Sequence, residues 1–232
     1  MLKRCFLLCC LLVLLCSISV PVQAESSGSC GKDVTWTLDD AGILTISGEG
    51  EIEDCLAIYK TPHPWYSARD TICSLVIEEG ITKIPSSAFY DCDNLVSVQL
   101  PDSLTEIGGR AFGDCDALVQ IDIPDAVQFI GISAFSGCDA LTEVMLPASL
   151  TEISANTFNL CLNLKTAHIP DGVSKIGDAA FVACNKLQSV QIPDSVRVIG
   201  DSAFGICVSL KEVYIPADVE EIGEGRSGIA RL

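Results

Sequence analysis

Hydrophobic residues recur along most of this chain with a period of 23 residues. Each period holds a phenylalanine, a cysteine three residues later and a leucine three residues after that, and a proline and an isoleucine keep the same register. The phenylalanine column consists of Phe89, Phe112, Phe135, Phe158, Phe181 and Phe204. The cysteine column consists of Cys92, Cys115, Cys138, Cys161, Cys184 and Cys207. Because no insertion breaks these columns, the period indicates a repeated structural unit.

Each unit contains a short stretch in which apolar and other residues alternate. In one unit Leu118, Ile121 and Ile123 carry this pattern, which predicts a strand. Pro124 ends the strand because proline cannot donate to a ladder, and Asp125 favours a turn. No unit holds ten residues of helical periodicity, so any helix is a single turn. One coil cannot bury its own apolar side, whereas stacked coils about 4.8 Å apart cover one another.

The repeated unit also resembles a known family. The pattern I-P-D-S-V-x-x-I-G-x-x-A-F-x-x-C-x-x-L-x-x-V is similar to the BspA-like leucine-rich repeats of bacterial secreted and surface proteins, over about residues 72–223. Trp36–Gly48 and Pro64–Ser67 resemble the N-terminal module of such proteins from gut bacteria. The predicted fold class is a repeat solenoid, mostly β: a leucine-rich-repeat-like stack of 23-residue coils, with six full coils and a partial one. The resemblance implies adhesion to host or bacterial surface components.

The stretch before the repeats is expected to cover the first coil, because the end of a solenoid needs a cap. Val34–Leu38 and Ile43–Ser47 alternate on either side of a turn, which predicts a β-hairpin within an N-terminal cap over 25–71. A linker is the alternative, but the alternation argues against it. The large side chains expected to plug the first coil are Trp36, Trp65 and Tyr66.

Residues 1–24 have the pattern of a secretory signal peptide. Lys3 and Arg4 precede an apolar run over Cys5–Val20, and small residues prepare a cut after Ala24. The run is short for a membrane span, which needs about 20 residues, so a retained anchor is the less favoured alternative. We expect no membrane span in the mature chain and a secreted or cell-surface location.

The last residues depart from the repeat. Arg226 and Ser227 stand where the pattern calls for Ala and Phe. We therefore expect a frayed tail over 224–232, or a product shorter than its longer relatives.

The composition of the chain excludes two classes of protein. The chain has 31 acidic against 14 basic residues and a net charge of −17, which is the wrong sign for a protein that neutralises nucleic-acid phosphates. Hydrophobic residues make up 49%, which excludes a disordered acidic tail.

Catalytic chemistry is sparse. His63 lies between prolines and His168 on a predicted strand, whereas a Cys–His nucleophile pair needs both groups within about 3 Å. Gly223–Gly228 has the spacing of a dinucleotide loop, but no helix follows to hold a pyrophosphate. We therefore predict that the protein is not an enzyme and uses no cofactor.

An acidic residue follows the strand proline in several units, at Asp102, Asp125, Asp171 and Asp194. Stacked carboxylates can hold calcium. Ala148 and Ala217 interrupt the row, which favours turn chemistry and a solvated rim, so we predict no metal site.

The column cysteines are predicted to be free thiols. Side chains of a ladder point the same way at about 4.8 Å spacing, which exceeds the Cβ separation of about 3.8 Å that a disulfide requires. The better candidates for one bridge are Cys30, Cys55 and Cys73.

The outward strand positions vary although the core columns are uniform. One outward column begins at Val76 and continues with the candidate binding residues Gln99, Asp122, Met145, His168, Gln191 and Tyr214. Unconstrained solvent positions would vary in the same way, but Met145, His168 and Tyr214 are apolar or amphipathic where solvent favours polar residues. The leading hypothesis is a non-catalytic module that binds an extracellular protein or glycan. The alternatives are a structural spacer without a ligand and an accessory domain of an extracellular enzyme.

Overall fold

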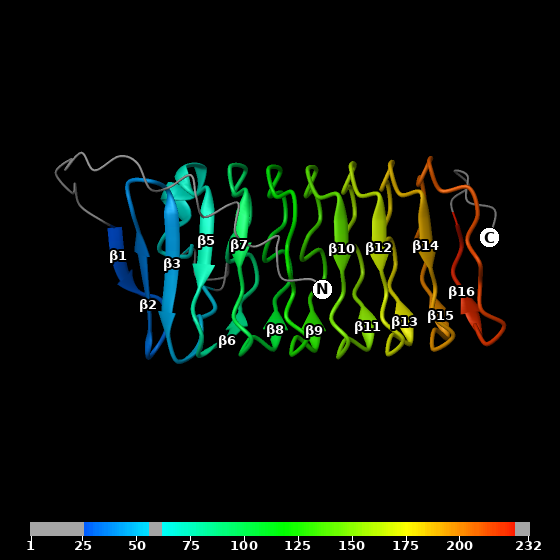
Figure 1. Ribbon diagram of the computed structural model, residues 1–232, viewed down its shortest axis with the longest axis horizontal. Coiled ribbons are helices and arrows are strands. Elements are labelled where there is room, and N and C mark those ends of the chain that lie inside the picture. Colours follow the sequence, from blue (N-terminus) through cyan, green and yellow to red (C-terminus); the bar gives the residue numbers. More distant parts are fainter. Residues whose placement is uncertain (1–25, 56–61, 226–232) are drawn as a thin grey trace, which may run out of the picture.

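The computed structural model describes residues 26–55 and 62–225, so the predicted signal peptide and residues 226–232 of the predicted tail lie outside the described residues. The chain winds into coils stacked along one long axis (Figure 1). The front strands are β1 (Ser26–Ser29), β2 (Val34–Leu38), β3 (Ile43–Gly48), β5 (Ser74–Ile77), β7 (Ser97–Gln99), β10 (Glu143–Met145), β12 (Thr166–His168) and β14 (Ser189–Gln191). The shorter return strands are β4 (Gly50–Glu51), β6 (Ile81–Ile84), β8 (Glu106–Ile107), β9 (Phe129–Ile130), β11 (Glu152–Ile153), β13 (Lys175–Ile176), β15 (Val198–Ile199) and β16 (Glu221–Ile222).

Strands of successive coils pair in parallel, and their partners are 23 residues apart. Glu143 lies opposite Thr166, and Thr166 lies opposite Ser189. The front row runs β1-β2-β3-β5-β7 and, after an interruption, β10-β12-β14. The return row runs β4-β6-β8-β9 and then β11-β13-β15-β16. This is the mostly β solenoid of 23-residue coils that the sequence predicts.

The structure corrects two strand predictions, because neither the unit around Ile121 nor the unit around Val213 forms a regular front strand. The unit around Ile121 alternates cleanly, yet the structure forms no regular strand there. The Gln120 amide donates to Asp122 Oδ1 at 3.2 Å, two residues along the same segment. This bond joins two side chains and does not occupy the backbone groups of the ladder, whereas Asp itself is a residue type that strands disfavour. The coil keeps its place in the stack because Ile121 remains buried.

Stacked aromatic rings fill the side of each coil that lies between its return strand and the next front strand. The six column phenylalanines are buried and form one continuous file, with neighbouring ring centroids 5.3 to 5.5 Å apart. The planes of Phe112 and Phe135 are parallel. At this separation the rings are offset-stacked, an arrangement that adds to the stabilisation from burial.

The column cysteines act as buried hydrogen-bond donors. Cys138 Sγ donates to the backbone carbonyl of Phe112 at 3.1 Å. The same bond recurs between Cys115 and Phe89, Cys161 and Phe135, Cys184 and Phe158, and Cys207 and Phe181. Burial raises the pKa of Cys138 to about 12, so this thiol stays protonated at neutral pH and can keep donating.

All nine cysteines of the described residues are free thiols, including those of the cap. The single bridge for which Cys30, Cys55 and Cys73 are candidates is therefore not formed in this structure. Cys73 Sγ instead donates to the carbonyl of Ala41 at 3.2 Å.

The cap contains the predicted hairpin. Strands β2 and β3 pair antiparallel from Val34 opposite Gly48 to Leu38 opposite Leu44. Strand β1 adds an outer antiparallel strand that the sequence pattern does not reveal, because its Ser-Ser-Gly-Ser segment has no apolar alternation. Strand β3 pairs in parallel with β5, which joins the cap to the first coil.

Two of the three expected plugs, Trp36 and Trp65, are buried, whereas Tyr66 lies at the surface. Trp65 is 1% exposed and stacks on Phe89 with centroids 5.5 Å apart, and Trp36 packs edge-on against Trp65. Tyr66, by contrast, is 38% exposed and begins the 3₁₀ helix η3 (Tyr66–Thr71), where its ring faces the guanidinium of Arg69. The prediction that Tyr66 plugs the first coil is wrong.

The turns beside the phenylalanine file use a left-handed backbone. In every coil the residue two before the phenylalanine has a positive φ, and so does the residue two after it. The second position is glycine only at Gly137 (φ 77°), and the most unusual occupant is Ile206 (φ 60°). A β-branched residue is strained in this region because its side chain collides with the backbone.

Replacing Ile206 by glycine is therefore expected to stabilise the protein. The side chain is 52% exposed, so little burial is lost, while relief of strain exceeds the entropic cost of glycine by about 0.5–1 kcal/mol. Ile132 is the matched control, since it is 60% exposed and is not among the residues with positive φ. Ile132→Gly should lower the free energy of unfolding by about 0.5–1 kcal/mol. Urea denaturation measures both, and destabilisation by Ile206→Gly would contradict the strain argument.

Candidate functional site

The front face is the outward surface of the front strands. Alternation along each strand turns the middle residue inward and its neighbours outward, as in β10, where Val144 is buried between exposed Glu143 and Met145. The six candidate binding residues are all exposed: Gln99, Asp122, Met145, His168, Gln191 and Tyr214. Asp122 and Tyr214 hold the same column position in coils that form no regular front strand. Met145, His168 and Gln191 lie directly opposite one another in consecutive strands.

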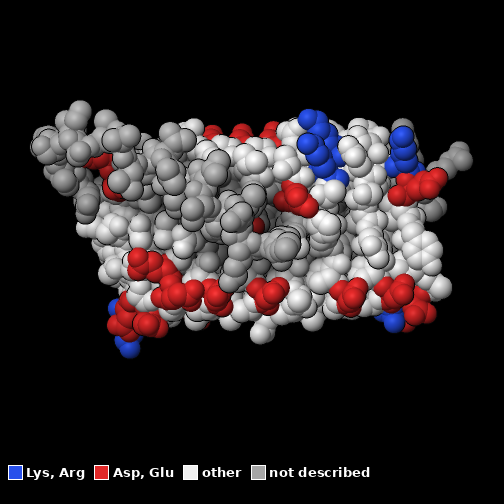
Figure 2. All heavy atoms as spheres, viewed as in Figure 1, with Lys and Arg blue, Asp and Glu red and all other residues white. Residues whose placement is uncertain are grey.

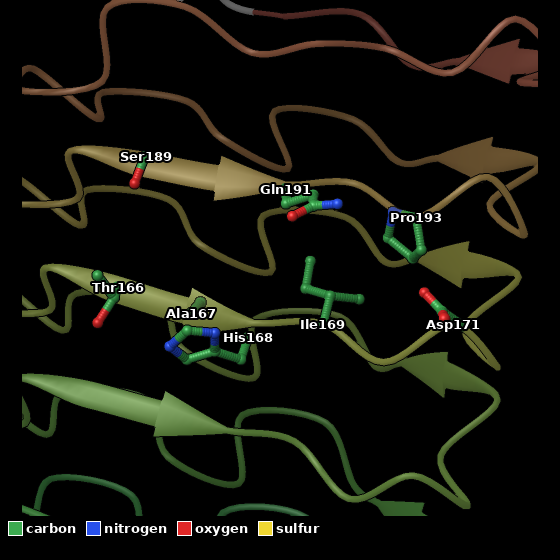
Figure 3. A pocket seen from close by; sticks show the side chains of 8 residues that line it. All are labelled: Thr166, Ala167, His168, Ile169, Asp171, Ser189, Gln191 and Pro193. Atoms are coloured by element: carbon green, nitrogen blue, oxygen red, sulfur yellow. The ribbon is translucent and has the colours of Figure 1, made fainter.

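Two hollows mark one part of the front face. The first has a volume of about 290 Å³ and is lined by Thr166, Ala167, His168, Ile169, Asp171, Ser189, Gln191 and Pro193 (Figure 3). The second, of about 300 Å³, is lined by Asp171, Gln191, Ile192, Pro193, Asp194, Ser195 and Tyr214. Because they share Asp171, Gln191 and Pro193, the hollows adjoin, and we call them together the coil groove.

The structure divides the predicted column into two groups. His168, Gln191 and Tyr214 line the coil groove, whereas Gln99, Asp122 and Met145 are not among its lining residues. That the column binds a ligand stays a prediction.

Sequence reasoning missed the part of the coil groove that is lined by residues of the turns. Asp171 and Pro193 belong to the turns after β12 and β14, and Figure 3 shows them on the turn side of His168 and Gln191. Their signal was present in the proline and aspartate columns, which turn chemistry alone explains. Their proximity to the outward column depends on how the chain leaves each strand, which the repeat pattern does not specify.

A short hydrogen bond orients His168. Its Nε2 lies 3.0 Å from Glu143 Oε1 in the preceding coil, and both side chains are well exposed. A carboxylate only accepts, so Nε2 is the donor of this bond. The pair holds the imidazole over the strand but contributes little stability because water screens it.

Charge is unevenly distributed over the molecule. Figure 2 shows acidic side chains gathered along the edge below the front strands, whereas lysine and arginine are few and lie towards the edges. The acidic turn residues bond to the next coil, as where the Ala148 N–H donates to Asp125 Oδ1 at 3.3 Å. This geometry supports the turn role predicted for Asp125.

A second acidic strip follows the cysteine column. Partial desolvation and the neighbouring Asp139 and Asp93 raise the pKa of Asp116. Desolvation and Asp91 likewise raise the pKa of Asp93. Within residues 26–55 and 62–225, no group of three or more His, Cys, Asp or Glu side chains is arranged to hold a metal ion.

The two histidines have separate partners. His63 is buried in the cap and stacks on Trp65 with centroids 5.2 Å apart, and burial lowers its pKa. His168 pairs with Glu143 on the front face. The column thiols point into the core, where burial raises the pKa of Cys92 to about 12 as it does that of Cys138. Buried, protonated thiols such as those of Cys92 and Cys138 are poor nucleophiles.

No helix in the described part of the chain is both long and apolar enough to cross a membrane. A third hollow, of about 220 Å³, lies on the return side and is lined in part by Glu152, Lys175 and Asp178. Its charged groups have opposite signs, and no residue of the predicted column contributes to it.

Comparison with known protein families identifies the same repeat that the structure shows as stacked coils. A family model described as "BspA type Leucine rich repeat region" matches residues 65–187 and 111–226, with six copies of the repeat. No curated protein matches the chain.

Solved structures share the fold. A leucine-rich repeat protein from Eubacterium ventriosum is 25% identical with a TM-score of 0.71, and the match covers 87% of this chain and 63% of that one. The T. pallidum leucine-rich repeat protein is 26% identical with a TM-score of 0.60, covering 78% of this chain and 89% of that one. One from Bacteroides ovatus is 20% identical with a TM-score of 0.61, covering 89% and 61%, and shows the fold alone. The chain thus spans less than two thirds of the Eubacterium ventriosum protein.

Proposed function

Because the chain belongs to the BspA-type leucine-rich repeat family, we propose that it is a non-catalytic binding module that recognises an extracellular protein or glycan through its front face. We place it outside the cell, secreted or attached to a cell surface, because residues 1–24 have the pattern of an export signal. Adhesion is the role that this combination favours.

One observation carries the proposal: three residues of the variable column line the coil groove. The core columns repeat the same residue types in every coil, whereas His168, Gln191 and Tyr214 differ from one another and line adjoining hollows. Ligand sites are concave surfaces with a few polar groups among apolar ones.

Binding should therefore depend on the coil groove. The purified protein is tested by biolayer interferometry against immobilised matrix proteins and glycans. The triple variant His168→Ser, Gln191→Ser and Tyr214→Ser should weaken binding at least about tenfold, because losing 1.4 kcal/mol of contacts changes a dissociation constant tenfold. These residues are exposed, so the urea midpoint should not move.

The control is the double variant Gln99→Ser and Asp122→Ser, which changes the same column outside the coil groove. It should bind like the wild type. Equal losses in both variants would contradict a role for the groove. A wild-type protein that binds nothing on the panel would favour the structural spacer instead.

A further inference from the structure

The coil groove has the dimensions of a site for a chain of ring-sized units. His168, Gln191 and Tyr214 occupy the same position in three consecutive coils. Since parallel strands are about 4.8 Å apart, the groove spans about 10 Å from the first of these residues to the last. Each hollow has a volume of about 300 Å³ or slightly less, so each accepts one small ring system and not an extended protein surface.

The polar groups of the groove suit a ligand rich in hydroxyl groups. Its hydrogen-bonding side chains include the hydroxyl groups of Thr166, Ser189 and Tyr214, the amide of Gln191 and the carboxylates of Asp171 and Asp194. Hydroxyl and amide groups both donate and accept, and carboxylates accept. This mixture matches a ligand whose own groups are each donor and acceptor.

His168 completes the pattern with an oriented ring. Its Nε2 is engaged by Glu143, and in the neutral imidazole this leaves Nδ1 as an acceptor. His168 lines the first hollow, and Figure 3 shows its ring at the end of β12, on the side of the strand away from Gln191. A ligand hydroxyl can donate to it there.

The charge of the groove excludes anionic ligands. Asp171 and Asp194 line it, and none of its lining residues is a lysine or arginine. The chain as a whole carries a net charge of −17. Sulfate, phosphate or carboxylate groups would therefore be repelled both near the site and at long range.

Tyr214 and Pro193 supply flat apolar surfaces at the far end. Tyr214 is 74% exposed, and its ring lines the second hollow with Pro193. Aromatic rings favour contact with C–H groups of positive edge character, because their faces are electron-rich. Sugar rings present such C–H groups on one face and hydroxyl groups around their rim.

We infer that the coil groove binds an uncharged oligosaccharide, with one sugar ring over Tyr214 and the hydroxyl groups of adjoining rings bonded to Gln191, Asp171 and His168. This inference rests on the proposed function and names the ligand class of the same site.

The test titrates the purified protein calorimetrically with cellohexaose, laminarihexaose, mannohexaose and chitohexaose, and with sialyllactose and a heparin hexasaccharide as anionic probes. At least one neutral probe should bind and neither anionic probe should. Tyr214→Ala should weaken binding about tenfold, whereas Tyr214→Phe, which keeps the ring, should stay within about threefold of the wild type.

Gln191→Ala has a matched control in the same protein. Gln191 and Gln99 both end a Ser-Val-Gln strand, but only Gln191 lines the groove. Gln191→Ala should weaken binding about fivefold to tenfold, and Gln99→Ala should not change it.

Three results would overturn the inference. Preference for the anionic probes contradicts the charge argument, and neutral binding that survives Tyr214→Ala and Gln191→Ala places the site elsewhere. Capture of a matrix protein that Tyr214→Ala abolishes, without binding to any neutral probe, leaves the proposed function standing but makes the ligand class wrong. Failure to bind any protein or saccharide rejects both.

Discussion

Replacing Phe135 by alanine should lower the free energy of unfolding by about 3–5 kcal/mol. Phe135 lies in the middle of the aromatic file, with ring centroids 5.5 Å from both Phe112 and Phe158 and nearly parallel planes. The variant leaves a cavity between two coils that cannot close, because each backbone is bonded to its neighbours. The N–H of Phe135, for example, donates to the Thr157 carbonyl at 2.9 Å. Urea denaturation followed by circular dichroism measures the loss.

Phe204→Ala is the matched control for position along the file. Its ring stacks on Phe181 at 5.4 Å, and it is the last ring of the file in the described part of the chain. In a solenoid each coil is stabilised mainly by its neighbours, so a change at the last ring should cost less than one at the centre. Equal costs at Phe135 and Phe204 would show that the file does not transmit stability from coil to coil.

The repeat made most of the fold predictable from the sequence, because a solenoid uses the same contacts in every coil. Uniform columns such as that of Phe135 must face the same neighbours, so their burial and their stacking follow from the period alone. The hairpin of β2 and β3 followed from alternation around a turn.

The predictions that were wrong or incomplete concern features that differ from coil to coil. Alternation around Ile121 predicts a strand that the structure does not form, and Asp122 is a residue type that strands disfavour. The outward column was identified, yet the coil groove beside it was not, since Asp171 and Pro193 reach it through the paths of their turns. The 23-residue period predicts the features that all coils share. A binding site depends on residues and turn paths that differ from coil to coil, which the period does not predict.

The N-terminal cap shows the difference between repeat register and packing most clearly. A substitution at its Trp65 is expected to cause the second large loss of stability. Counting 23 residues back from Phe89 leads to Tyr66, but the structure places Trp65 on the aromatic file. Trp65 Nε1 donates to the Ala88 carbonyl at 2.7 Å, a bond that the phenol of Tyr66 does not supply. The indole therefore both stacks on Phe89 and bonds to the first coil.

Trp65→Ala should lower the free energy of unfolding by about 3–5 kcal/mol, because it removes the ring that Trp36, His63 and Phe89 all contact. Trp65→Phe keeps the stacking but leaves the Ala88 carbonyl without this donor, and it should cost about 1–3 kcal/mol. Urea denaturation measures each variant, and limited proteolysis tests whether the cap loosens before the coils.

Tyr66→Ala tests whether the repeat register or the packing of the core determines which side chain covers the first coil. Tyr66 holds the register of the phenylalanine column but lies at the surface against Arg69, so its loss should cost about 1 kcal/mol or less. A cost as large as that of Trp65→Ala would mean that the repeat register, and not the indole with its bond to Ala88, decides which side chain covers the first coil. The expected order of destabilisation is therefore Trp65→Ala, then Trp65→Phe, then Tyr66→Ala, because only the first removes both the stacking and the hydrogen bond that join cap to solenoid.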